Sequence, residues 1–130
     1  MKRIFIDPTK CDGCKNCSLA CMEAHRQDGG TGIYTLDLQD PSNQSRNRIL
    51  TDGKGGYNPI FCRHCDIPDC AGACMSGALQ KNMDNGLVEY DAEKCAACYM
   101  CVMSCRYGVP AISPDRKRVI KCDFCAHLEE

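Results

Sequence analysis

Apolar residues in this chain occur in short runs, and no run is long enough to form an extended amphipathic element. Residues 5–6, 32–38 and 48–51 have the apolar and β-branched character of short strands. The last two lie within a segment, 22–61, that is otherwise rich in glycine and polar residues. The pattern therefore predicts isolated short strands in the first half of the chain, joined by irregular loops.

The second half of the chain has a clearer pattern. Residues 78–82 and 87–90 are two strand-like runs separated by a turn that contains Asn85-Gly86. Asn-Gly between two such runs is a strong signal for a β-hairpin. Pro68, followed by Asp69, favours the start of a short helix, because proline is tolerated in a first helical turn.

Composition shows that a hydrophobic core cannot be the main source of stability. The chain has 130 residues, which suits one compact domain or two small lobes. It contains no Trp and only three Phe, but 14 Cys, so cysteine is a large part of its hydrophobic fraction of 44%. A small chain of this kind needs covalent or metal cross-links to fold.

The beginning of the sequence helps to choose between disulfides and metal. The basic residues 1–3 are followed by only three apolar residues before Asp7 and Pro8. A signal peptide needs an apolar run of about 7–15 residues, and a membrane span needs about 18. The sequence therefore predicts a cytoplasmic protein without a membrane span, in which thiols stay reduced and clustered cysteines indicate metal. A formal net charge of −1 gives no indication of nucleic-acid binding.

The cysteines form four groups. They are Cys11, Cys14, Cys17 and Cys21; Cys62, Cys65, Cys70 and Cys74; Cys95, Cys98, Cys101 and Cys105; and Cys122 with Cys125. The first and third groups have the spacing C-x2-C-x2-C-x3-C, which is the run of bacterial ferredoxins. The second group has the close variant C-x2-C-x4-C-x3-C. The spacing predicts 4Fe–4S clusters with iron bound through these cysteines.

The spacing has a physical reason. Three thiolates within seven residues allow one loop to cover three corners of a cubane, and the fourth ligand must come from elsewhere. A cysteine about one helical turn further along points toward a different cluster, so two runs exchange their last ligands. Small residues between the ligands let backbone N–H groups approach the cluster sulfurs. Hydrogen bonds from these groups adjust the reduction potential of the cluster. These residues are Gly13, Gly72, Ala73, Ala96 and Ala97.

Two other interpretations of the cysteines are weaker. A disulfide scaffold would need an oxidising compartment, for which the sequence gives no sign. Zinc sites use pairs of C-x2-C units separated by a longer spacer, which fits these runs badly. His25, His64 and His127 lie near cysteines, and histidine can ligate iron. Because the thiols nearly complete the sites, these histidines are expected to be exposed polar residues or tuners of potential.

An internal repeat supports a modular α+β fold. Asp7, Lys10 and the four cysteines of the first group recur at one constant offset as Asp91, Lys94 and the four cysteines of the third group. Each unit is predicted to be a short strand, a cluster-binding loop and one or two helical turns. The fold class is thus α+β, with ferredoxin-like modules of short strands, a hairpin and short helices around paired clusters.

The predicted organisation has four segments. Residues 1–21 carry the first motif with its strand, and residues 22–61 form an insert that is either an irregular surface segment or a docking surface. Residues 62–105 form a complete two-motif ferredoxin-like module, and residues 106–130 begin a fourth motif.

The segments 11–21, 62–70 and 121–125 together resemble a known family. The chain is similar over nearly its whole length to the four-cluster ferredoxin-like electron-transfer subunits of dimethyl sulfoxide reductase, formate dehydrogenase and hydrogenase complexes. In that family the first motif pairs with the fourth and the second with the third. The resemblance implies one cluster on Cys62, Cys65, Cys70 and Cys105, and another on Cys95, Cys98, Cys101 and Cys74. It implies a third on Cys11, Cys14 and Cys17, and a fourth on Cys21, Cys122 and Cys125, each with one more ligand.

Two departures from the family pattern change this expectation. Family members usually have proline after the last cysteine of a motif, where this chain has Met22, Met75 and Arg106. Met75 and Arg106 make it most similar to the iron–sulfur subunit that accompanies nickel carbon monoxide dehydrogenase. The family's fourth motif also has two further cysteines, so the natural chain is expected to continue past Glu130. A three-cluster variant or a ligand from a partner protein is the alternative.

The resemblance implies electron transfer rather than catalysis. The sequence has no nucleotide-binding loop and no recognisable catalytic triad or carboxylate pair. The expected function is the relay of single electrons between a redox enzyme and a second oxidoreductase. The first is expected to be carbon monoxide dehydrogenase, formate dehydrogenase or hydrogenase, and the second a flavin-dependent nicotinamide oxidoreductase or a hydrogenase. A freely diffusing polyferredoxin and a zinc-binding interaction module are the alternatives.

Overall fold

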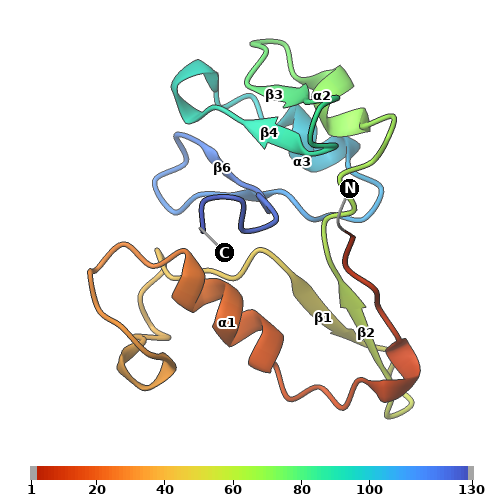
Figure 1. Cartoon of the computed structure of the whole chain (residues 1–130), viewed down its shortest axis with the longest axis vertical. Coiled ribbons are helices and arrows are strands. Elements are labelled where there is room, and N and C mark those ends of the chain that lie inside the picture. Colours follow the sequence, from red (N-terminus) through yellow and green to blue (C-terminus); the bar gives the residue numbers. More distant parts are fainter. Residues whose placement is uncertain (1–2, 129–130) are drawn as a thin grey trace.

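Short elements build two lobes in the computed structural model, which describes residues 3–128 (Figure 1). The lower lobe in this view contains α1 (Asn16–Ala24), β1 (Arg48–Thr51) and β2 (Tyr57–Ile60). The upper lobe contains α2 (Asp69–Ala73), β3 (Leu79–Lys81), β4 (Val88–Tyr90), α3 (Met100–Ser104), β5 (Ala111–Ile112) and β6 (Val119–Ile120). Met1, Lys2 and Glu130 lie outside the described residues. No helix within residues 3–128 has the length and apolar character needed to cross a membrane.

The strands pair only as antiparallel hairpins. Strand β1 pairs with β2, β3 with β4, and β5 with β6. In the second hairpin Leu79 faces Tyr90, and the turn between the strands contains Asn85-Gly86. The structure therefore confirms the predicted hairpin and the predicted strand at 48–51. It also confirms the helix that begins at Asp69, with Pro68 as its N-cap.

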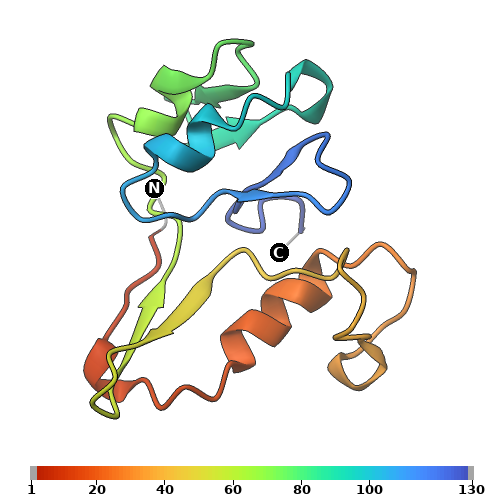
Figure 2. The ribbon, with the colours of Figure 1, turned by 180° about the vertical axis from the view of Figure 1, so that it is seen from behind.

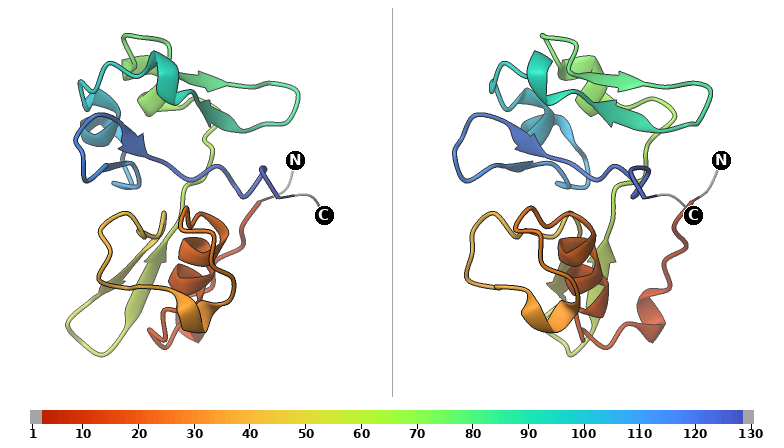
Figure 3. Two further views of the ribbon diagram at one scale, coloured as in Figure 1. Left: turned by 90° about the vertical axis from the view of Figure 1, so that its left-hand side faces the viewer. Right: turned by 60° about the vertical axis from the view of Figure 1, so that its left-hand side comes forward.

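The C-terminal segment lies between the two lobes. Figure 2, from behind, and both views of Figure 3 show the chain leaving the upper lobe after β6 and running back between the lobes. The contacts agree with this placement, because His127 Nε2 lies 2.9 Å from the carbonyl oxygen of Ala24, at the end of α1. Arg46 Nη1 donates to the carbonyl oxygen of Lys121 over 2.7 Å. Residues 121–128 therefore hold the lower lobe against the upper one.

The hydrophobic core is small and consists partly of cysteine. Leu79, Val88, Cys101 and Val119 form the buried cluster. The partly buried hydrophobic residues around it include Cys70 and Cys74. So few buried aliphatic side chains cannot offset the entropy of ordering more than a hundred residues. This core therefore supports the prediction that metal contributes to folding, and the short helices and hairpins make a small α+β fold.

The sequence repeat is also a repeat of backbone conformation. Asp7 and Asp91 each accept a hydrogen bond from the backbone N–H two residues later, over 3.0 Å in both cases. Each aspartate precedes a short 3-10 helix, Pro8–Lys10 or Ala92–Lys94. The N-caps of α1 and α3, Lys15 and Tyr99, both have φ of 61°. The two predicted units therefore share the loop and helix, but a strand precedes only the second unit, where β4 ends at Tyr90.

The strand predicted at residues 5–6 does not form. Among the described residues, 3–7 pair with no strand, and the side chain of Phe5 is 97% exposed. The segment instead lies beside Phe61, Cys62 and Phe124, with which it lines a shallow pocket. The apolar pair was sufficient for extended backbone, but a strand also needs a neighbouring strand as a hydrogen-bond partner.

The strand predicted at 32–38 is also wrong, because Arg26 imposes another conformation. Residues Ile33–Thr35 form a 3-10 helix that follows Gly32, whose φ is +87°. The guanidinium of Arg26 donates to the carbonyl oxygens of Gly32 and Thr35 over 3.1 and 3.0 Å. It also pairs with Asp28 over 2.7 Å. These bonds close the segment into a compact loop, so its carbonyl groups are not available for a strand ladder.

Gly13 provides a direct test of the lower lobe. Its φ is +74°, and a Cβ atom placed on it would lie 2.5 Å from Cε1 of Tyr57 in β2. We expect Gly13→Ala to destabilise the protein by more than the roughly 1–2 kcal/mol of left-handed strain, since the ring must also move. Gly29→Ala is the control, because Gly29 has φ of +75° and no atom within 4 Å of such a Cβ. Equal losses of free energy of unfolding in urea would contradict the close approach to Tyr57.

Candidate cluster-binding sites

The first complete set of cysteine thiols lines one cavity in the upper lobe. Its walls include Cys62, Cys65, Cys70 and Cys105, and its volume is about 330 Å³. Three of these cysteines come from the second group, and the fourth comes from the end of α3. The structure therefore brings together four thiols that the sequence separates into two groups.

The second complete set lines a neighbouring, tighter cavity. Cys74, Cys95, Cys98 and Cys101 all contribute to its walls, and its volume is about 10 Å³. One of these cysteines comes from the second group and three come from the third group.

Helices α2 and α3 explain why the two sets interlock. Helix α2 contains Cys70, which lines the first cavity, and is capped at its C-terminal end by Cys74, which lines the second. Helix α3 has the reverse arrangement, with Cys101 on the second cavity and Cys105 as its cap on the first. Each helix therefore contributes one thiol to each cavity, separated by about one helical turn.

All four cysteine groups share one backbone feature. The residue directly before the second cysteine of each group has a positive φ: Gly13 (74°), His64 (43°), Ala97 (55°) and Phe124 (60°). Left-handed residues of this kind turn successive N–H groups toward one concavity, which favours bound anions such as an iron–sulfur cluster. The sequence predicted backbone approach at Gly13 and Ala97 from their size. It gave no such signal at His64 and Phe124, whose side chains are large.

The first cysteine group lies in the lower lobe and is more open. Cys14 and Cys17 are exposed, and Cys11 is partly buried. The buried side chain of Asn47 donates to Cys17 Sγ over 3.3 Å. This contact comes from the segment 22–61, so the insert supplies part of the surroundings of the first motif.

The fourth group meets the last cysteine of the first group. Arg46 donates its backbone N–H to Cys21 Sγ over 3.2 Å, and Phe124 donates its backbone N–H to Cys122 Sγ over 3.4 Å. Burial raises the pKa of Cys21, but hydrogen bonds from His25 and Arg46 outweigh it and leave the pKa below its usual value. Burial raises the pKa of Cys122 to about 11. His25 connects the two groups, because its Nδ1 lies 3.7 Å from Cys21 Sγ and its Nε2 lies 2.8 Å from Asp123 Oδ1.

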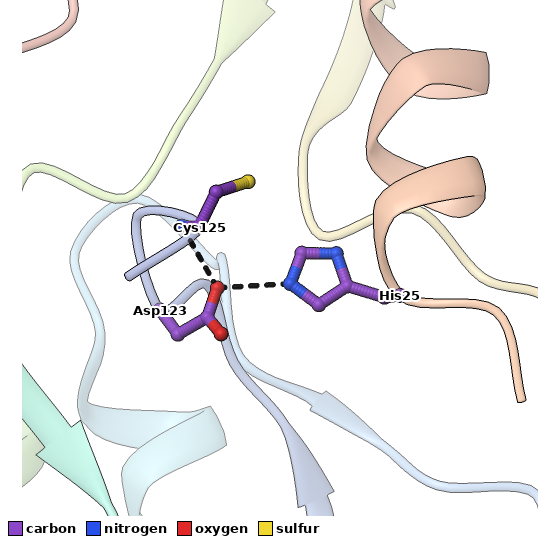
Figure 4. Close-up of side chains that lie close together, drawn as sticks. All are labelled: His25, Asp123 and Cys125. Carbon is purple, nitrogen blue, oxygen red and sulfur yellow. Dashed lines mark hydrogen bonds and ion pairs between the residues drawn. The ribbon is translucent and has the colours of Figure 1, made fainter. Parts of the chain in front are cut away.

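A polar cluster surrounds this fourth site, and Figure 4 shows three of its members. Asp123 Oδ1 lies 2.8 Å from His25 Nε2 and accepts the backbone N–H of Cys125 over 3.0 Å. Asp123 Oδ2 lies 2.7 Å from His127 Nδ1. Burial raises the pKa of Asp123, but the two histidines outweigh it and bring this pKa to about 2. Contacts with Cys21 and Asp123 raise the pKa of His25 to about 9.

His64 has a different environment from the one expected. Its side chain is almost completely buried, with an exposed fraction of 1%, so the expectation of an exposed polar residue is wrong here. Its Nδ1 accepts the backbone N–H of Val88 over 2.9 Å, and its ring packs edge-on against Phe124. Burial and the nearby ammonium groups of Lys121 and Lys81 lower its pKa to about 4. His64 is therefore a neutral core residue that joins β4 to the loop of the second motif.

The donor set fits iron–sulfur chemistry. Thiolates are soft ligands that suit iron–sulfur clusters, zinc or Cu(I), and two sets of four line common cavities. The C-x2-C-x2-C-x3-C spacing favours iron–sulfur clusters over zinc, whose sites use paired C-x2-C units. Fold and donor set together define a ferredoxin-like iron–sulfur protein.

Comparison with known proteins identifies the family. Residues 54–130 match the 4Fe-4S dicluster domain, and the chain belongs to this family. The match confirms the expected 4Fe–4S clusters and the resemblance to iron–sulfur subunits of this family. The number of clusters and the similarity to the subunit that accompanies nickel carbon monoxide dehydrogenase stay predictions.

Some of the similar proteins are named as subunits or chains of oxidoreductases. The chain is 36% identical over 127 residues to the beta subunit of NADH-dependent phenylglyoxylate dehydrogenase of Aromatoleum evansii. It is 35% identical over 125 residues to YnfG of Escherichia coli, a probable anaerobic dimethyl sulfoxide reductase chain, and 31% identical over 119 residues to E. coli protein NrfC. These alignments cover 94%, 93% and 92% of this chain, but only 26%, 60% and 51% of the relatives.

Asp123 is the residue through which the fourth site can be tested. We expect Asp123→Asn to weaken the attachment of residues 121–128 to α1, because the amide cannot accept from both His25 and His127 through its two terminal atoms. Hydrogen exchange of backbone amides in 121–128 should become at least several-fold faster. Asp115→Asn is the control, since Asp115 bonds only within its own turn, to Ser113 and Lys117. Unchanged exchange in Asp123→Asn would contradict a bridging role.

Proposed function

We propose that this protein relays single electrons between a catalytic redox enzyme and a second oxidoreductase, and that it has no catalytic site of its own. The observation that carries this proposal is the interlocked pair of cysteine sets on α2 and α3. Cavities that share two helices lie about one helical turn apart, which suits transfer of electrons from one bound group to the next. The names of the similar proteins support a place within an oxidoreductase complex.

The ligand assignment belongs to the same proposal. We assign one cluster to Cys62, Cys65, Cys70 and Cys105, and a second to Cys95, Cys98, Cys101 and Cys74. We assign Cys11, Cys14 and Cys17 to a third site, and Cys21, Cys122 and Cys125 to a fourth, with one further ligand each. The bound clusters supply reversible one-electron chemistry.

The chain's own residues control the surroundings of these sites. Val88 and Val109 are buried and line the first cavity. Asn47 and the backbone N–H groups of Arg46 and Phe124 donate to thiol sulfurs. Hydrogen bonds of this kind stabilise thiolates and raise the reduction potential of a cluster. The side chains within residues 3–128 therefore serve to hold the clusters and to adjust their reduction potentials. None of them is placed to make or break bonds in a substrate.

The electron-donating or electron-accepting enzyme is proposed first as a class and then as a particular enzyme. A catalytic redox enzyme is supported by the similar subunits named above. The finer proposal is nickel carbon monoxide dehydrogenase, which rests on Met75 and Arg106, with formate dehydrogenase or hydrogenase as alternatives. The second partner is then a flavin-dependent nicotinamide oxidoreductase or a hydrogenase.

We also propose a cytoplasmic location, where reduced thiols remain available for metal.

The segment 22–61 is the proposed docking surface for the catalytic partner. Tyr34 and Leu38 in this segment are fully and largely exposed, and Arg26 fixes the turn around Tyr34 through bonds to Gly32 and Thr35. Exposed apolar side chains on an ordered loop are typical of a protein interface. A freely diffusing polyferredoxin serving several enzymes would instead use an acidic surface, and the nearly balanced charges of this chain do not favour it.

Single substitutions test the exchange of ligands. Cys105→Ser should remove or convert the cluster at Cys62, Cys65 and Cys70, although Cys105 itself lies in the third group. Cys74→Ser should do the same to the cluster at Cys95, Cys98 and Cys101. Electron paramagnetic resonance of each reduced variant should show loss of a different signal. Loss of the same signal in both variants would contradict the assignment.

The metal content tests both the function and the number of clusters. Protein prepared without oxygen should contain about sixteen iron and sixteen acid-labile sulfide per chain if all four sites bind a cubane. About eight of each would restrict the relay to the two complete cysteine sets. Brown colour and reversible reduction by dithionite should accompany either value. Colourless protein with bound zinc would overturn the electron-transfer proposal.

A further inference from the structure

Lys121 is a buried cation between two cysteine groups. Its exposed fraction is 3%, and its ammonium group donates to the carbonyl oxygens of Val88 and Cys122, each over 2.9 Å. The same nitrogen lies 3.6 Å from Cys62 Sγ, a distance that fits a hydrogen bond to sulfur. Lys121 also lines the first cavity together with the thiols of Cys62 and Cys105.

No carboxylate neutralises this charge. Within residues 3–128 none of the ion pairs includes Lys121, although buried ammonium groups normally need a paired negative charge. The buried His64 offers no negative charge, and its Nδ1 accepts the backbone N–H of Val88. The groups that can balance the ammonium are therefore the thiolates of the neighbouring site, with Cys62 in direct contact.

Lys121 also connects this site to the lower lobe. Its carbonyl oxygen accepts from Arg46 Nη1 over 2.7 Å, and the backbone N–H of Arg46 donates to Cys21 Sγ over 3.2 Å. A continuous series of contacts therefore runs from Cys21 through Arg46 and Lys121 to Cys62. It joins the proposed fourth site to the site on Cys62, Cys65, Cys70 and Cys105.

We propose that Lys121 is a positioning residue that raises the reduction potential of the cluster bound by Cys62, Cys65, Cys70 and Cys105. The inference rests on the proposed function. Reduction adds one electron, and hence one negative charge, next to an ammonium group that is itself buried, where charge interactions are stronger than in bulk water. The cavity of Cys74, Cys95, Cys98 and Cys101 is not lined by Lys121, so the effect falls on one of the two interlocked sites. Lys121 thus makes the first site the preferred place for an electron.

The test compares reduction potentials of the protein prepared without oxygen. Lys121→Met keeps the length and volume of the side chain but removes its charge. We expect it to lower the equilibrium constant for reduction of this cluster about tenfold, equivalent to about 59 mV for one electron. Potentials are measured by titration with dithionite and electron paramagnetic resonance, with Cys105→Ser used to identify the signal of this site. Iron content and thermal unfolding are measured on the same samples.

Two further variants make the result decisive. Lys81→Met is the matched control, because Lys81 donates to the carbonyl oxygens of His64 and Gly86 in the same module but to no thiol. Its effect on the potential should be much smaller. Lys121→Arg keeps a cation and should stay near the wild-type potential, which preserves the test even if Lys121→Met loses its iron.

The possible outcomes separate this inference from the proposed function. An iron-loaded Lys121→Met variant with the wild-type potential would overturn the role of Lys121 and leave electron transfer intact. If the reduction potential in Lys121→Arg is lowered as much as in Lys121→Met, the charge of Lys121 is not the cause. This result would also overturn the proposed role of Lys121. A wild-type protein that binds no iron would overturn the proposed function, and this inference with it.

Discussion

The convergence of thiol groups from distant parts of the chain is the constraint on which the rest of this structure depends. Helices α2 and α3 each contribute one cysteine to the first cavity and one to the second. The small apolar core lies directly against these helices. Leu79, Val88 and Val119 are too few to fix the fold alone. The hairpins and short helices are therefore best understood as supports that hold thiols at the right places, with metal as the cross-link.

The second constraint is electrostatic. Thiolates and clusters concentrate negative charge inside a chain whose formal charges nearly balance. Buried or half-buried hydrogen-bond donors lie next to the sulfur atoms. They are Lys121, Arg46, Asn47 and backbone N–H groups at left-handed residues. These donors come from the insert and from the C-terminal segment as well as from the motifs. The polar interior of this protein is thus organised around sulfur rather than around paired carboxylates.

Local sequence signals predicted the local structure well. The hairpin at Asn85-Gly86 and the helix after Pro68 each depend on a few adjacent residues. The two sets of cysteines that line common cavities are those that the family resemblance implied, and their assignment to clusters stays a proposal. For the first and fourth groups the structure shows His25 between Cys21 and Asp123, and their assignment also stays a proposal.

Sequence reasoning failed where a distant side chain decides the outcome. Residues 32–38 have the composition of a strand, but the guanidinium of Arg26 takes their carbonyl groups. Phe5 and Ile6 lack a partner strand. His64 is buried because Val88 and Phe124 enclose it, and Lys121 is buried because it reaches Cys62 across the fold. None of these contacts has a signal in the adjacent sequence.

The exchange of cysteines between α2 and α3 also sets an order of events in time. During synthesis Cys62, Cys65 and Cys70 leave the ribosome first, but the thiol that shares their cavity is Cys105. Under the proposed exchange, Cys74 likewise leaves the ribosome before Cys95, Cys98 and Cys101, which line the same cavity. Under this assignment neither site has all four of its ligands until the chain has emerged past residue 105. The order of the cysteines therefore makes the completion of both sites late in synthesis.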